Sequence, residues 1–95
     1  MASVKELKKD IDYLAYEVIS DCFTAMTVSP DEKSDDLSVI VADTVKLRND
    51  LIARANHPDG KRNSAKVKDH YRLLRKDLVT GVDKLFDRVS KAVKA

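Results

Sequence analysis

The stretch NHPDGKRNS, residues 56 to 64, contains one of the two prolines and one of the two glycines in this chain of 95 residues. Pro58 disfavours helix at the residue before it, and the Asp-Gly pair that follows supplies the residues that a chain reversal needs. Asn63 or Ser64 can then cap a new helix. The stretch therefore predicts a turn between two helices. The alternative is an anion site at the basic start of the second of these helices.

After this turn, one long amphipathic helix is predicted over residues 64 to 93. Gly81 interrupts it at a cost of about 1 kcal/mol relative to alanine. We interpret this glycine as a point of close packing or tolerated weakness rather than as a hinge. The apolar side chains that recur at helical spacing are Val67, Tyr71, Leu74, Leu78, Val82, Leu85, Val89 and Val93.

Before the turn, two further amphipathic helices are predicted, over residues 4 to 27 and 30 to 56. Each start carries a capping box, in which a serine, Ser3 or Ser29, is followed three residues later by glutamate. Ser34, followed by two aspartates, is an alternative start for the second helix. The side chains that recur at helical spacing form one stripe along each helix. The stripe of the first helix contains Val4, Leu7, Ile11, Leu14, Ala15, Val18, Cys22, Ala25 and Met26. The stripe of the second helix contains Leu37, Ile40, Val41, Thr44, Val45, Leu51, Ile52 and Ala55.

Three amphipathic helices with short connections can bury their stripes against one another. The economical arrangement is an all-α, antiparallel, up-down-up three-helix bundle, because short loops make consecutive helices antiparallel neighbours. No strand pattern competes with it, and residues 1 to 95 suffice for one domain. A helical hairpin that completes its core by dimerising is the alternative.

Charge is divided unevenly along the chain. Residues 1 to 60 carry seven Lys and Arg against twelve Asp and Glu, whereas residues 61 to 95 carry eleven against four, so the balances are −5 and +7. A set of bases on one face of the third helix, the basic stripe, is the candidate contact for an anion or a nucleic acid. Its members are Lys61, Lys68, Arg72, Arg75 and Lys76. We expect acids of the first 60 residues to neutralise part of this surface.

Arg48 interrupts the apolar stripe of the second helix and is therefore a candidate buried polar residue. A buried guanidinium must find an acceptor, because an isolated charge in the core is strongly unfavourable. We expect it to pair with a carboxylate of the first helix, or to pack its stem while its head reaches solvent. The candidate partners are Asp10, Glu17 and Asp21.

The first helix has a wider apolar surface than a three-helix core needs. Its additional apolar residues are candidates for self-association, although aromatic rings at a core boundary are an equally physical interpretation. They are Tyr16, Ile19 and Phe23, with Tyr13 beyond them.

No catalytic, metal-binding or cofactor-binding site is predicted. His57 and His70 are 13 positions apart, not the four that place two imidazoles on one metal. Cys22 is the only cysteine, so no internal disulfide can form, and its place on the apolar face predicts a core residue. The carboxylates are spread over solvent-facing positions, where nothing shifts a pKa toward acid-base catalysis.

Two segments, LRNDLIARANHPDG at 47 to 60 and LVTGVDKLFDRVSKA at 78 to 92, resemble small, uncharacterised helical proteins of Bacteroidota bacteria. The resemblance implies a bacterial cytosolic bundle and no activity, substrate or site. A cytoplasmic location is also expected because charges interrupt the first 14 residues and no apolar run approaches the ~20 residues of a membrane span.

These observations favour a non-catalytic helical interaction module that binds a protein partner or forms a weak homodimer, without membrane contact. The alternative is a nucleic-acid-associated accessory protein that uses the basic face of the third helix. Exposure of the basic stripe to solvent distinguishes the two.

Overall fold

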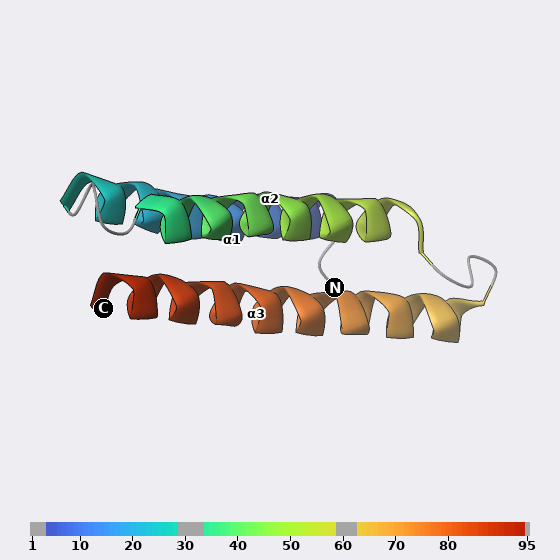
Figure 1. Cartoon of the computed structure of the whole chain (residues 1–95). Coiled ribbons are helices and arrows are strands. Elements are labelled where there is room, and N and C mark those ends of the chain that lie inside the picture. Colours follow the sequence, from blue (N-terminus) through green and yellow to red (C-terminus); the bar gives the residue numbers. More distant parts are fainter. Residues whose placement is uncertain (1–3, 29–33, 59–62, 95) are drawn as a thin grey trace.

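The computed structural model describes residues 4–28, 34–58 and 63–94. In these residues it contains three helices and no strand: α1 (Val4–Val28), α2 (Ser34–Asn56) and α3 (Ser64–Lys94). The helices lie side by side along their lengths, and α2 runs antiparallel to both α1 and α3 (Figure 1). All three pack against one another. The predicted all-α, up-down-up bundle is therefore confirmed.

The start of α3 has the cap that its sequence predicts. Asn63 Oδ1 accepts hydrogen bonds from the backbone N–H groups of Ala65, at 3.0 Å, and Lys66, at 3.2 Å. Two N–H groups that lack a partner within the helix are satisfied in this way. The predicted helix start near Ser29 lies outside the described residues, and α2 as described begins at Ser34.

The core is built from the three predicted stripes. Thr44 is its buried polar member, and the Thr44 hydroxyl donates to Ile40 O at 2.7 Å, which leaves no unpaired group. Val4, Val45 and Val93 were expected in the stripes and are exposed, because two lie at helix ends and Val45 at the outer edge of α2. The buried apolar residues are Leu7, Ile11, Ala15, Val18, Cys22, Leu37, Ile40, Leu51, Ala55, Leu74, Leu78, Val82, Leu85 and Val89.

Gly81 marks a close approach of α3 to α2. The side chain of Leu47 packs where a Cβ at position 81 would stand. The interpretation of this glycine as a point of close packing is confirmed.

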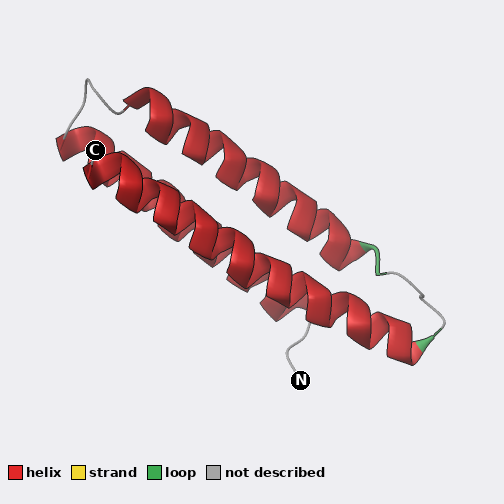
Figure 2. Ribbon diagram, turned by 60° about the horizontal axis from the view of Figure 1, so that its bottom comes forward, coloured by secondary structure: helices red, strands yellow, loops and turns green. Residues whose placement is uncertain are grey.

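α3 extends well past the described start of α1 (Figures 1 and 2). Leu7 of α1 and Leu78 of α3 line the same groove, and the two helices run in the same direction. At ~1.5 Å per residue, Val4 is therefore level with about Arg75. About three turns of α3, from Ser64 to Leu74, lie beyond it. We call this segment the α3 overhang.

The end of α2 covers part of the overhang. Tyr71 donates from its hydroxyl to Ala55 O at 2.9 Å, and His70 Nε2 lies 2.7 Å from Arg54 O. Both carbonyls belong to the last turn of α2, where the regular helix hydrogen bonds run out, and Arg54 O also accepts from the His57 N–H at 3.3 Å. Side chains of α3 therefore complete the C-terminal end of α2.

Candidate functional site

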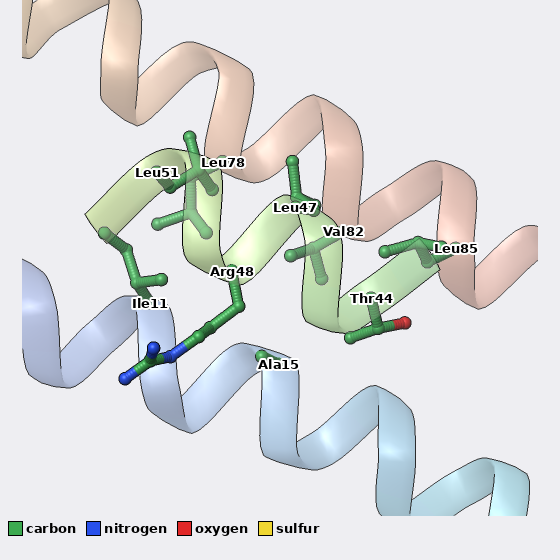
Figure 3. Close-up of a pocket in the computed structure, with 9 residues that line it drawn as sticks. All are labelled: Ile11, Ala15, Thr44, Leu47, Arg48, Leu51, Leu78, Val82 and Leu85. Carbon is green, nitrogen blue, oxygen red and sulfur yellow. The ribbon is translucent and has the colours of Figure 1, made fainter. Parts of the chain in front are cut away.

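The central void between the described helices is too small for a ligand larger than water. A void of about 10 Å³ lies between the three helices, which is close to the minimum for one water molecule. Figure 3 shows that apolar side chains of all three helices surround it. The residues that line it are Ile11, Ala15, Thr44, Leu47, Arg48, Leu51, Leu78, Val82 and Leu85. The two larger hollows formed by the described residues are open grooves on the surface.

An open groove of about 290 Å³ runs between α1 and α3, and we call it the α1–α3 groove. Its volume is at the lower limit of small-molecule sites, roughly 300–1,000 Å³, but such sites are usually more enclosed. Two of its apolar side chains are well exposed, Tyr13 at 62% and Val79 at 56%. The residues that line it are Leu7, Asp10, Tyr13 and Leu14 of α1 and Arg75, Leu78 and Val79 of α3.

A second groove, of about 180 Å³, lies between α1 and α2. Tyr16 and Ile19 of α1 line it together with Val45 of α2. Phe23 follows Ile19 by one turn on the same side of α1. Tyr16 is 66% exposed and Phe23 is 56% exposed, while Ile19 is half-buried. These four residues form an apolar surface that we call the outer patch, and it contains all three predicted self-association residues.

Arg48 does not lie in the core as expected: its side chain is 40% exposed. Its Nε donates to Asp12 Oδ1 at 2.7 Å, and its Nη1 donates to Asn49 Oδ1 at 3.0 Å. The stem lines the central void, and the guanidinium reaches across to α1 (Figure 3). Both expectations are met in part: the stem packs while the head reaches solvent, and the head pairs with a carboxylate of α1.

The partner of Arg48 is on the predicted helix but is not a predicted residue. Asp12 faces α2, as its place in the α1–α2 groove shows, whereas Asp10 lines the groove toward α3. Glu17 and Asp21 follow Asp10 at spacings of seven and eleven, which keeps them on that same side of α1. The three expected acids therefore point away from Arg48.

The basic stripe faces solvent. Lys68, Arg72 and Lys76 are exposed and Arg75 is half-buried, while Lys61 lies outside the described residues. Arg72 Nη2 lies 3.5 Å from Asp69 Oδ1, one turn earlier in α3.

No described carboxylate of α1 or α2 forms an ion pair with the four described bases of the stripe. Among the described residues, the expected neutralisation by acids of the first 60 residues does not take the form of ion pairs with this surface. The overhang is one physical reason: Lys68 and Arg72 lie beyond the described start of α1, past the acids of that helix.

Two ion pairs that join α2 to α3 were not foreseen. Arg54 Nη2 lies 2.9 Å from Asp77 Oδ2, and Arg88 Nη1 lies 2.9 Å from Asp43 Oδ2. The pairs lie along one edge of the α2–α3 contact. In the sequence, these pairs are indicated only by charged residues beside the apolar stripes. Such residues do not identify their partners, because the sequence does not show how far one helix is shifted along another.

Cys22 is fully buried, as predicted. Burial raises the pKa of the Cys22 thiol above its usual range, the Asp21 carboxylate raises it further, and Arg88 partly offsets this. The thiol is therefore protonated and weakly nucleophilic at neutral pH.

No family model matches this chain, and no curated protein or solved structure matches it. Over the described ranges, no group of three or more His, Cys, Asp or Glu is placed to hold a metal ion. None of the three described helices combines the length and apolar character needed to cross a membrane.

Proposed function

We propose that this chain is a non-catalytic helical interaction module that binds a protein partner, or a second copy of itself, through exposed apolar side chains. The observation that carries the proposal is the outer patch. Tyr16 and Phe23 each expose more than half of a large side chain, and Val45 of α2 continues their surface across the groove. A contiguous apolar surface of this kind is typical of protein interaction sites. Single apolar residues scattered over a surface are common and do not indicate such a site.

The chemistry of the patch suits a protein partner. Tyrosine and phenylalanine bury large areas on association with little loss of side-chain freedom. Arg48 and Asp12 border the patch, and their ion pair supplies the polar rim that usually surrounds an apolar interface centre.

Site-specific photo-cross-linking tests this proposal directly. A photo-reactive phenylalanine analogue replaces Tyr16 in one variant and Val39, an exposed residue of α2 outside the patch, in the control. After irradiation in lysate of the source cell, we expect discrete cross-linked protein bands from position 16 and none from position 39. Equal labelling at both positions, or none at either, contradicts the proposal.

A second candidate function is binding to nucleic acid through the basic stripe, because the described bases of the stripe face solvent without partners from α1 or α2. Their number is small, however, and Asp69 lies among them. Nuclease treatment of the same lysate separates the two functions, because cross-links that depend on nucleic acid disappear after digestion.

A further inference from the structure

We infer that the α1–α3 groove, together with Lys68 and Arg72, which continue its α3 rim, docks an amphipathic helix of a partner protein whose edge toward α3 is acidic. This inference goes beyond the proposed function, because it names the chemistry of a partner and places that partner on a different face from the outer patch. The two can therefore fail separately.

The groove has the shape that a fourth helix requires. α1 and α3 run in the same direction and make the least extensive contact of the three helix pairs. Leu7 and Leu78 are buried at its floor, and Tyr13 and Val79 stand exposed at its sides. Apolar side chains at spacings of three and four along a helix fill a trough of this kind.

The two rims of the groove carry opposite charge. Asp10 stands on the α1 rim, and Glu17 follows it on the same side of the helix. Arg75 stands on the α3 rim, and Arg72 and Lys68 continue that edge toward the start of α3. A docked helix would therefore present acidic side chains toward α3 and basic or polar ones toward α1.

The bases are available for such contacts. Lys68 and Arg75 form no ion pair with any carboxylate in the described ranges. The pair between Arg72 and Asp69 is exposed on both sides, so it contributes little and is readily exchanged. Lys68 and Arg72 lie in the overhang, past the described start of α1, so a helix in the groove could continue along α3 beyond the described residues of α1.

The apolar floor favours a protein helix over a polyanion. A phosphate backbone would use the bases but would offer nothing apolar to Tyr13 and Val79. From Lys68 to Lys76 the stripe rises only ~12 Å, which is a short contact for a duplex. Arg75 belongs to both the groove and the stripe, and an amphipathic helix uses both surfaces together.

A display library of 24-residue helices tests the inference. Each member has a fixed apolar stripe and Glu or Lys at random at every flanking position, and selection uses the full-length chain as the target. We expect the recovered helices to carry Glu on the flank of the stripe that faces α3 and Lys on the flank that faces α1. Lys on both flanks, no segregation of charge between the flanks, or no recovered binder overturns the inference.

Paired variants then locate the site with a labelled helix from the selection. Val79→Asp should weaken binding by about tenfold or more, because it places a charge in an apolar contact. Val39→Asp changes a valine of similar exposure on α2 and should leave binding unchanged. Equal effects of the two variants overturn the inference, and the urea midpoint of each variant confirms that both are folded.

Charge reversal provides an independent measurement that does not disturb the core. Lys68→Glu/Arg72→Glu changes two exposed residues and should weaken binding by about tenfold. A helix with Lys in place of Glu on its acidic flank should restore that loss. Lys84→Glu/Lys91→Glu, on the other half of α3, is the matched control and should have little effect.

The same variants also distinguish this inference from binding at the outer patch and from binding to nucleic acid. Selected helices that bind Val79→Asp normally but lose binding to Tyr16→Ser use the outer patch, which retains the proposed function and rejects this inference. A labelled DNA duplex that competes with the selected helix and loses binding with the Lys68→Glu/Arg72→Glu variant identifies a nucleic-acid surface instead.

Discussion

Gly81 of α3 lies directly against Leu47 of α2: a Cβ at position 81 would stand 2.8 Å from Leu47 Cδ2 and 3.2 Å from Cδ1. Ordinary contacts of a Cβ with carbon are longer, so the leucine occupies space that only glycine leaves open. The lower helix propensity of glycine is thus offset by the packing of Leu47 on the α3 backbone.

Substitution of Gly81 should separate these two effects. Gly81→Ala gains about 1 kcal/mol of helix propensity but displaces the end of a flexible side chain, so we expect stability within about 1 kcal/mol of the parent. Gly81→Leu should destabilise by about 2 kcal/mol or more, because Leu47 cannot move far enough. Urea unfolding measures both.

The neighbouring position provides the control for Gly81. Thr80 is exposed, so Thr80→Ala changes helix propensity without touching Leu47. In a Leu47→Ala background, Gly81→Ala should become more favourable by about 1 kcal/mol, since the obstacle is gone. An unchanged effect in that background contradicts the packing explanation.

Arg48→Ala should cost about 1 kcal/mol in the free energy of unfolding. The pair with Asp12 is about half exposed on both sides, and exposed pairs contribute roughly 0.2–1 kcal/mol. Loss of the packed stem adds to this. A double-mutant cycle with Asp12→Asn isolates the pair, and a coupling of ~3 kcal/mol, typical of buried pairs, would show that the site is less solvated than its exposure indicates.

Stability should fall at alkaline pH because of Cys22. Its pKa is raised in the folded state, so the unfolded chain loses the thiol proton first. The contribution to stability is therefore complete below the pKa of the unfolded thiol, about 8.5, and is lost as pH rises above it. Urea midpoints from pH 7 to 9.5 should decline more steeply for the parent than for Cys22→Ala, and parallel curves would contradict the assignment.

Weak self-association through the outer patch is expected as the simplest use of that surface. An isologous contact would place the same faces of two copies together. Sedimentation equilibrium at ~100 μM, a concentration that populates a micromolar dimer, should show species above 10.7 kDa that disappear in Tyr16→Ser/Phe23→Ser. A single 10.7 kDa species in the parent excludes this mode of association.

Binding to nucleic acid should be weak, with a dissociation constant of about 1 mM near 150 mM salt, because few bases contribute. If the four described bases each displace a counterion, the log-log salt slope is near −3.6. Fluorescence anisotropy from 50 to 200 mM salt, with a labelled duplex and a labelled single strand, measures both quantities. Micromolar binding at 200 mM, weakened by Arg72→Glu/Arg75→Glu, would promote the nucleic-acid function over the interaction module.

The fold was predictable because its signals are local. Helical spacing of apolar residues, the Asn63 cap and the break at Pro58 each depend on residues near one another in the chain. They were sufficient for three helices and their order. Errors occur at the margins of the stripes, where a residue such as Val45 has the right spacing but no neighbour to cover it.

The surfaces were less predictable because they depend on the alignment of one helix along another. Nothing near Arg48 in the sequence indicates that Asp12, rather than Asp10, is level with it and turned toward α2. The overhang depends on the same alignment, and it leaves Lys68 and Arg72 beyond the described acids of α1. The α1–α3 groove exists only between two helices, so no single stripe reveals it.

The overhang also divides the molecule into parts of unequal local stability. Backbone N–H groups from Lys68 to Leu74 are helical, yet the described contacts that hold this segment to the bundle include only a few side chains, among them Tyr71. Their exchange with deuterated water should therefore be faster than that of amides around Leu85, which sit against both other helices. A partner that docks on the overhang would slow this exchange, so the amides of α3 would report occupancy residue by residue.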